Sequence, residues 1–292
     1  MMKRIYFVAM IISFAFINLS CGGLDGDNSD FDFGNNGNVE NPYINGYDRL
    51  PNSIRIATYN THRCEGNLSQ SASIDRSHYD KTAEVIKRMQ PDVIALQELD
   101  SVTTWHLAFQ LQELATRSGL NYTYNYTINY RGGKYGNGIL SKEKPAKVTH
   151  VDLVGEEHRK MCVAEFADYV FIATHFCHLN DANRKASAVI INNFINTNYA
   201  GYNKPIYLAG DLNESNLNSE MFKELLSKWE IISTGNVTFI GTGSTAKRLD
   251  YVLAYKGNNA PYEVLGTATP SYSGLDLNFV SDHLPVLVDI KK

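Results

Sequence analysis

The fold of this chain is constrained most strongly by a set of short apolar segments, each followed by a polar side chain. In chain order they are IRIATY before Asn60, DVIAL before Gln97 and Glu98, VFIAT before His175, and PIYLAG before Asp211 and Asn213. A fifth segment, PVLVDI, directly follows the loop that carries Ser281, Asp282 and His283. A strand fixes the direction of the residue at its end, so these side chains can converge on one rim. Single polar ends are usually turn residues, but five in one chain are hard to attribute to turns.

The pattern of helices and strands predicts the fold class. Helical spacing of apolar residues marks Tyr79–Met89, Thr104–Ser118 and Arg184–Ile195. Strand patterns occupy the ranges 54–59, 92–96, 122–130, 138–140, 161–166, 169–174, 205–209, 248–254 and 285–290. Helices and strands are mixed without strict βαβ alternation. We therefore expect an α+β domain over residues 53–292, with two face-to-face β-sheets flanked by helices in a four-layer α/β/β/α sandwich.

The first 52 residues have a different composition. Residues 1–21 combine the basic pair Lys3 and Arg4 with an apolar stretch and end at Cys21, which resembles a bacterial lipoprotein signal whose cysteine is lipidated. Residues 22–52 are rich in Gly, Asn and Asp and predict a flexible tether. We therefore expect a chain anchored by lipid to a bacterial membrane in the cell envelope, periplasmic or surface-exposed. The alternatives are an ordinary cleaved signal and an uncleaved anchor.

The net charge limits which binding partners are expected, and the cysteine content limits which disulfides can form. Lys plus Arg total 27 and Asp plus Glu total 31, so the formal charge is −4 and no strong basic field attracts nucleic acid. Nucleic acid is therefore an allowed but not a favoured partner, and we expect a monomer. After Cys21 the chain has Cys64, Cys162 and Cys177, so at most one intrachain disulfide can form. A rim disulfide between Cys64 and Cys177 is the alternative to three free thiols.

The polar residues at the strand ends are of types that suit phosphoester chemistry. Carboxylate and amide oxygens are ligands for Mg²⁺ or Mn²⁺, and they come here from Asn60, Glu98, Asp211, Asn213 and Asp282. His175 and His283 add imidazoles that titrate near neutral pH. Metal ligands, histidines and amides together predict the attack of water on a phosphorus ester.

Seven short motifs in order resemble the endonuclease/exonuclease/phosphatase superfamily, which includes deoxyribonucleases, apurinic endonucleases, inositol polyphosphate 5-phosphatases and bacterial sphingomyelinases. The motifs are ATYN (57–60), PDVIALQE (91–98), GNGILS (136–141), ATHF (173–176), GDLN (210–213), RLDYVL (248–253) and SDHLP (281–285). They span nearly the whole domain. The resemblance implies the four-layer fold and a divalent-metal-dependent hydrolase.

The resemblance also implies a role for each matched position. Glu98 resembles the main metal ligand, helped by Asn60 and Asp282. Asp211 resembles the residue that orients or deprotonates the attacking water, and Asn213 the residue that holds a phosphate oxygen. His283, with Asp250 as its carboxylate partner, resembles the histidine that contacts the scissile phosphate. His175 resembles a second histidine, a candidate acid for the leaving oxygen.

Other positions have two interpretations each. His62, His178 and Asn137 are candidates for contact with phosphate or substrate, and the alternative is a structural role in loops at the rim. For Arg63 we favour the loop role over a phosphate clamp. Glu157 either supports His175 or forms a surface ion pair, for which Arg159 is the nearby partner. The aromatic run 122–130 either stacks bases or sugars or is simply an amphipathic strand.

These features predict a hydrolase of phosphoester bonds that works by in-line attack of water. The expected substrate is a phospholipid, its head group or a small phosphoester. The alternative is a secreted or tethered nuclease that acts on DNA or RNA. A non-catalytic binding protein on the same fold is less expected, because the predicted catalytic set is intact.

Overall fold

Two six-stranded sheets contain all twelve strands of the described part of the chain. The computed structural model describes residues 42–43, 46–66, 76–240 and 246–292. The first sheet, in the order β11-β12-β1-β2-β4-β3, contains β1 (Ser53–Asn60), β2 (Val93–Ser101), β3 (Asn121–Tyr130), β4 (Gly133–Ser141), β11 (Val264–Ala268) and β12 (Val286–Lys291). The second sheet, in the order β5-β6-β7-β8-β10-β9, contains β5 (Lys147–Leu153), β6 (Arg159–Glu165), β7 (Val170–His175), β8 (Ile206–Asp211), β9 (Trp229–Ile231) and β10 (Asp250–Tyr255).

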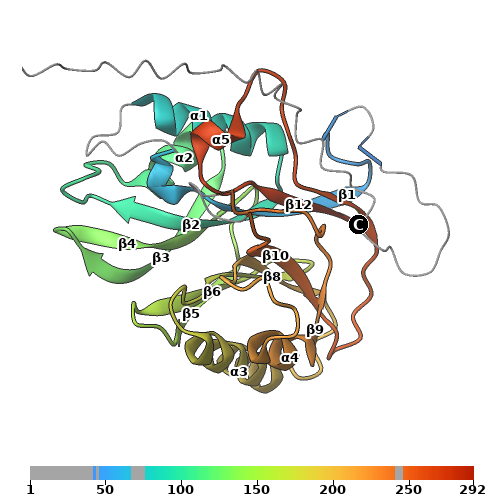
Figure 1. Ribbon diagram of the computed structural model, residues 1–292. Coiled ribbons are helices and arrows are strands. Elements are labelled where there is room, and N and C mark those ends of the chain that lie inside the picture. The colour runs from blue at the N-terminus through green and yellow to red at the C-terminus, as the bar shows by residue number, and fades with distance from the viewer. Residues whose placement is uncertain (1–41, 44–45, 67–75, 241–245) are drawn as a thin grey trace, which may run out of the picture.

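The helices cover the outer faces of the two sheets (Figure 1). On the first sheet lie α1 (Arg76–Met89), α2 (Gln110–Ser118) and the short α5 (Leu277–Val280), and on the second lie α3 (Asp181–Asn198) and α4 (Glu220–Leu226). Each helical layer packs on its sheet through its own hydrophobic core, and a third core lies between the sheets. The four-layer sandwich predicted from the sequence is therefore confirmed.

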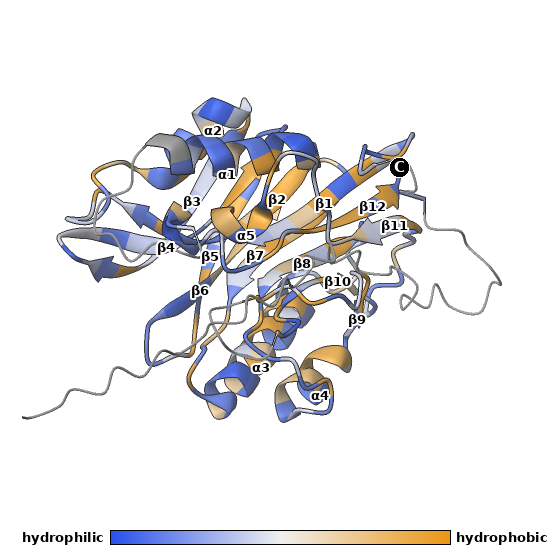
Figure 2. Cartoon of the chain, turned by 45° about the horizontal axis from the view of Figure 1, so that its top comes forward, coloured by the Kyte–Doolittle hydropathy of each residue, from blue (hydrophilic) through white to orange (hydrophobic). Residues whose placement is uncertain are grey.

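The core between the sheets explains why the central strands are so apolar. Ile56, Val93 and Val288 of the first sheet and Phe171 and Ala209 of the second are buried together there. Strands covered on both faces have few positions left for polar side chains. In Figure 2, β1, β2 and β12 are accordingly hydrophobic along most of their length. The polar residues of β1 and β2 lie mainly toward the C-terminal ends of these strands, whereas Arg55 of β1 and Asp289 of β12 form an ion pair inside the sheet.

Two parallel strand pairs set the direction of those ends. β1 runs parallel to β2, with Asn60 beside Gln97, and β7 runs parallel to β8, with His175 beside Asp211. The antiparallel pairing of β8 with β10 places Asp250 opposite Asp211. Parallel neighbours end at the same edge of a sheet. This topology delivers polar residues that are far apart in sequence to one place.

A buried ion pair holds the chain before β1 against the domain. The guanidinium of Arg55 donates to both carboxylate oxygens of Asp289, at 2.8 and 2.6 Å, and neither side chain is exposed. Arg55 also donates to the carbonyl of Tyr47, and the buried hydroxyl of Tyr43 donates to Asp289 at 2.8 Å. The predicted tether boundary at residue 52 is therefore too late, because part of its last ten residues is packed. The rest of the tether, the signal segment and Cys21 lie outside the described residues.

Several elements differ from the sequence prediction. The helix predicted to begin at Thr104 begins at Gln110, because the preceding residues form a loop. In that loop Thr103 donates through its hydroxyl to Asp100 and accepts from the backbone of His106. Strands β5, β9 and β11 and helices α4 and α5 were not predicted, and each is short or half exposed. Across the described residues, no helix has the length and apolar character that a membrane span requires. Cys64, Cys162 and Cys177 are all free, so the rim disulfide is not formed.

Candidate active site

Residues from both sheets meet where the central strands end. Asn60 closes β1 and its side-chain amide donates to Glu98 of β2 and to Asp211 of β8, at 3.1 Å in each case. The amide oxygen of Asn60 accepts the backbone N–H of His62 at 3.1 Å, which fixes the orientation of the amide. Asn60 thus joins the carboxylates of the two sheets, as the pattern of strand ends predicted.

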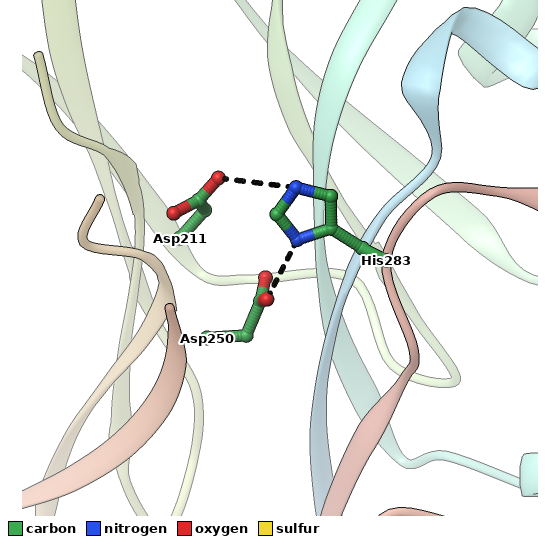
Figure 3. A group of neighbouring side chains, drawn as sticks. All are labelled: Asp211, Asp250 and His283. Atoms are coloured by element: carbon green, nitrogen blue, oxygen red, sulfur yellow. Dashed lines mark hydrogen bonds and ion pairs between the residues drawn. The ribbon is translucent and has the colours of Figure 1, made fainter. Parts of the chain in front are cut away.

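A histidine lies between two buried carboxylates beside this junction (Figure 3). His283 Nδ1 lies 2.7 Å from Asp250 Oδ2, and its Nε2 lies 3.8 Å from Asp211 Oδ2. The loop before β12 holds the ring there, because Ser281 accepts the backbone N–H of His283 and donates to the carbonyl of Asn60. The predicted pairing of His283 with Asp250 is therefore formed in the structure.

Protonation of this group follows from burial and charge. Burial opposes a charge on His283, but Asp250, with help from Asp211 and Asp282, outweighs it and raises the pKa of His283 to about 10. Burial and the nearby Asp250 raise the pKa of Asp211 to about 7, although His283 and two hydrogen-bond donors oppose the shift. An imidazolium thus lies beside a carboxylate that can accept a proton near neutral pH. A base with such a pKa is well matched to abstracting a proton from water.

Two side chains of the site stand on left-handed backbone. Glu98 has a φ of 58° and Asn213 a φ of 51°. Asn adopts this conformation readily, whereas a residue such as Glu adopts it only when its surroundings impose it. At Glu98 the register between β2 and β4 shifts, which turns this carboxylate out of the sheet. Asn213 donates its backbone N–H to Asp211 Oδ1 at 2.8 Å and its amide to the carbonyl of Phe176 at 3.0 Å. The left-handed backbone thus orients Glu98, a predicted metal ligand, and lets Asn213 hold the carboxylate of Asp211.

Two groups of residues fit a divalent cation. Asp282 Oδ1 is buried without a hydrogen-bond partner, and burial followed by the charge of Glu98 raises the pKa of Asp282. A carboxylate oxygen that lacks a hydrogen-bond partner and repels a second carboxylate is stabilised by a cation near both. Glu98 and Asp282 therefore fit Mg²⁺ or Mn²⁺, although His62 also lies 3.7 Å from this oxygen. The Asn60 amide turns its nitrogen toward Glu98 and its oxygen toward the backbone of His62, so its role as a ligand stays a prediction. Asp211, Asp250 and His283 also place ligand atoms within 4.8 Å of one another. In that second group, however, the histidine already bonds one of the two carboxylates.

The second histidine is held by an arginine. Arg159 of β6 is almost completely buried and directs its two terminal nitrogens at His175 Nδ1 (3.5 Å) and His178 Nδ1 (3.3 Å). Burial, followed by the charge of Arg159, keeps the pKa of His175 well below its usual value. Glu157 does not contact His175. It pairs with Arg159 at 3.2 Å, so the ion-pair alternative is confirmed.

The remaining candidates lie around this centre. His175 Nε2 is 3.6 Å from Asp211 Oδ2, which places it in the site, and His178 reaches the site only through Arg159. His62 Nδ1 donates to the carbonyl of Gly66 at 3.0 Å and lies 3.7 Å from Asp282. Asn137 is buried between Asn125 and the carbonyl of Lys160, so its contacts are those of a structural residue.

Three further residues shape the site: the sequence indicates Ser281 only as part of the loop before the last strand, and Thr238 and Phe239 were not predicted. Ser281 ties the His283 loop to β1, Thr238 accepts the backbone N–H of Asp250 at 3.0 Å, and the ring of Phe239 lies 5.0 Å from that of His283. Ser281 lies within the SDHLP motif and carried a signal. Thr238 and Phe239 come from a loop without any motif. Backbone contacts bring that loop to the site, because Phe239 pairs with His283 and Leu284 donates its N–H to the carbonyl of Thr238.

Solved structures show where the same fold recurs. Among those that match are a mannosyl-6-phosphatase of Bacteroides thetaiotaomicron, at 18% identity with a TM-score of 0.62 over 82% of this chain and 99% of that one. The human nocturnin catalytic domain matches at 18% identity and a TM-score of 0.63, over 87% and 99% of the two chains. The TDP2 of D. rerio, solved with a single-strand DNA product, matches at 15% identity and a TM-score of 0.63, over 82% and 99%.

Sequence comparison identifies the family. A search of curated proteins finds no match. The model of the Endonuclease/Exonuclease/phosphatase family matches residues 57–283, which include every strand end described above. With the fold and the gathered acidic, amide and imidazole side chains, this match shows that the chain belongs to the Endonuclease/Exonuclease/phosphatase family of phosphoester hydrolases.

Proposed function

We propose that Asp211 is the base that activates water in this hydrolase, and that His283 neutralises charge on the phosphate. The observation that carries the proposal is the position of the Asp211 carboxylate. It is buried between the Asn60 amide, the backbone N–H of Asn213 and the imidazole of His283. A water that donates to Asp211 Oδ2 loses its proton to that oxygen as it attacks phosphorus. The raised pKa of Asp211 makes the carboxylate basic enough for this transfer.

The histidines stabilise the charge that builds on the phosphate oxygens. His283 is held as an imidazolium by Asp250, so its Nε2–H presents a preorganised positive charge. His175 is neutral, because Arg159 bonds its Nδ1, and its Nε2–H therefore donates a hydrogen bond. A neutral imidazole is a poor acid. We therefore propose hydrogen-bond donation for His175 in place of proton delivery to the leaving oxygen.

The metal ligands and the phosphate-holding amide complete the site. We propose that Glu98, Asn60 and Asp282 hold Mg²⁺ or Mn²⁺ and that Asn213 contacts a phosphate oxygen. A bound divalent cation would supply positive charge to a phosphate oxygen and lower the barrier to attack. Two observations support this assignment: Asp282 Oδ1 is buried without a hydrogen-bond partner, and Glu98 has left-handed backbone.

The proposed substrate is a phospholipid, its head group or a small phosphoester. Net negative charge supports it over DNA, because phosphate-rich polymers are bound mainly through clustered lysines and arginines. We further propose a lipid-anchored monomer in a bacterial cell envelope, supported by the basic and apolar residues before Cys21. Retention of the full-length chain in membranes, and its release to the soluble fraction by Cys21→Ser, tests the anchor.

A panel of phosphoesters tests the activity on the chain without residues 1–21. The panel contains phospholipids, inositol phosphates, sugar phosphates, nucleotides and plasmid DNA, each with Mg²⁺ and with excess chelator. We expect turnover that chelation abolishes and Mn²⁺ or Mg²⁺ restores. Asp211→Asn should reduce turnover by on the order of 10²-fold or more. The matched control is Asp168→Asn, at an exposed turn between β6 and β7.

Each outcome bears on one part of the proposal. Full activity of Asp211→Asn, with the control equally active, removes this residue from the mechanism. Undiminished rates in chelator contradict the metal assignment. A preference for plasmid DNA that is strongly inhibited by salt supports the nuclease alternative over the small-substrate proposal. Binding of phosphoesters without any turnover supports a non-catalytic protein.

A further inference from the structure

The turn that follows β1 is strained and presents one arginine to the site. His62, Arg63 and Cys64 have φ values of 44°, 52° and 56°, three consecutive left-handed residues. Each such residue costs about 1–2 kcal/mol relative to right-handed backbone. Gln110 of α2 bonds the carbonyl of Arg63 at 2.6 Å and holds the turn in place. A loop that only connected two elements would have no need of this conformation.

A buried network fixes the side chain of Arg63. Glu65 accepts two hydrogen bonds from the guanidinium, at 3.2 and 2.9 Å. Glu65 lies 3.2 Å from His106 Nε2, and the other ring nitrogen of His106 bonds Asp100. The third guanidinium nitrogen, Nη1, makes no hydrogen bond within the described chain and lies 3.8 Å from Glu98 Oε2. Arg63 therefore holds a rigid cation beside the proposed metal ligand.

A second arginine lies near the first, on the same aromatic ring. The guanidinium carbon of Arg131 is 3.4 Å from the ring centroid of Trp105, and that of Arg63 is 6.0 Å from it. Arg131 belongs to the turn between β3 and β4. Within the described parts of the chain no carboxylate pairs with Arg131, and residues 121–141 contain no Asp or Glu. Its only polar side-chain partner is the hydroxyl of Tyr130, at 3.2 Å.

The surface at this turn is hollowed. Residues 129–134 line an open depression of about 370 Å³, and Lys134 adds a further positive charge to it. Tyr130 lines the depression and meets the ring of Trp105 edge to face at 6.1 Å. The guanidinium of Arg131 already covers a face of the Trp105 ring. The ring therefore orients a cation, which suits an anion more than a stacked base.

We propose that Arg63 and Arg131, spaced by Trp105, bind a second anionic group of the substrate, a phosphate or a carboxylate near the scissile phosphate. Arg63 has two carboxylate neighbours, Glu65 and Glu98, whereas Arg131 pairs with no carboxylate of the described residues and Lys134 adds a third cation, so net positive charge remains in this region. Guanidinium groups form strong paired hydrogen bonds to phosphate and carboxylate oxygens. This inference rests on the proposed function for the position of the scissile phosphate. It narrows the substrate class to phosphoesters with a second negative charge.

Binding of two phosphonates tests the subsite independently of turnover. Methylphosphonate carries one anionic group and methylenebisphosphonate carries two, and neither is hydrolysed. Affinities are measured by calorimetry, at equal free Mg²⁺, on the chain without residues 1–21, and tryptophan fluorescence reports on Trp105. We expect methylenebisphosphonate to bind about tenfold more tightly than methylphosphonate. Arg131→Gln should remove most of this advantage and leave methylphosphonate binding unchanged. Lys223→Gln, an exposed cation on α4, is the matched control and should leave both affinities unchanged.

The outcomes separate this proposal from the proposed function. Equal affinity of the two phosphonates for the wild type, or equal weakening of both by Arg131→Gln, overturns the subsite. Adenosine binding that changes Trp105 fluorescence as strongly as the bisphosphonate does would assign the surface to base stacking, and also overturns it. Selective bisphosphonate binding by a chain that hydrolyses no phosphoester would support the subsite and refute only the proposed hydrolytic role.

Discussion

Replacing Arg159 by Gln should raise the pKa of His175 and change how the reaction responds to acid. Arg159 Nη1 lies 3.5 Å from His175 Nδ1, in a nearly dry environment. At an effective dielectric constant of about 20, a unit charge at that distance opposes protonation by about 5 kcal/mol. Glu157 offsets part of that charge, because it lies 3.2 Å from the guanidinium. We therefore expect the pKa of His175 to rise in the variant, although burial still holds it down.

Other charged groups around His175 set the direction of the effect on rate. His283 and His178 lower the pKa of His175 further, whereas Asp211 Oδ2, at 3.6 Å from Nε2, is the one carboxylate near the ring among the described residues. Once protonated, His175 would form an ion pair with Asp211 and make this carboxylate a weaker base. The wild-type rate already falls below about pH 7, where Asp211 itself takes up a proton, and the rate of Arg159→Gln should fall further as the pH drops through the new pKa of His175. The wild type keeps His175 neutral over the same range.

The assay is kcat/KM between pH 5 and 9, together with the histidine NMR signals of each variant. Arg159→Lys keeps the charge and should shift the profile little, and Glu157→Gln should not add the second loss of rate that protonated His175 causes. At pH 8 to 9, where His175 is neutral in all variants, the rates of Arg159→Gln and wild type should approach one another. Superimposable profiles for wild type and Arg159→Gln, with an unshifted His175 signal, would refute the assigned role of Arg159.

Three further changes test the site and the fold. Asp250→Asn removes the charge that orients His283, so kcat should fall on the order of 10²–10⁴-fold, with the circular dichroism spectrum retained. Asp289→Asn leaves the charge of Arg55 buried without its partner. Arg55→Met leaves the charge of Asp289 buried and also removes the hydrogen bonds from Arg55 to the chain before β1. Either change should lower the free energy of unfolding by about 3–5 kcal/mol in urea, and a loss below 1 kcal/mol would contradict the fully buried pair. Glu65 is held by Arg63 and His106, which overcome the opposing effect of burial and lower its pKa to about 2. Its stabilisation is therefore complete above about pH 4.5 and is lost as the pH falls toward 2, so Glu65→Gln should flatten the pH dependence of unfolding in that window.

The part of the site that the sequence predicts is the part fixed by strand ends. Asn60, His175 and Asp211 each close a buried strand, and a strand that is apolar on both faces leaves no freedom about where its last residue points. His283 and Asp250 lie next to strand ends in the same way. These side chains converge because β1 pairs in parallel with β2 and β7 with β8. A run of apolar residues indicates a buried strand but does not reveal which strand it pairs with.

The remaining features depend on contacts between segments that carry no local signal. Arg159 begins a strand and looks like a surface residue in sequence, yet its guanidinium contacts His175 at the end of β7 and His178 in the loop that follows. Thr104–Phe109 has helical spacing, but bonds among Asp100, Thr103 and His106 stabilise a loop instead. A side chain that satisfies the backbone locally competes with the helix, and spacing alone does not reveal it.

Backbone conformation links the two parts of this site. Glu98, at the bulge within β2, and Arg63, in the turn after β1, both have left-handed backbone, and their side chains lie 3.8 Å apart. Each of these conformations lowers the stability of the fold and persists only because surrounding contacts hold it in place. The bulge of β2 holds Glu98, and the buried chain of Glu65, His106 and Asp100 holds Arg63. The strained turn thus keeps the guanidinium of Arg63 beside Glu98, where the proposed second anionic group of the substrate would bind.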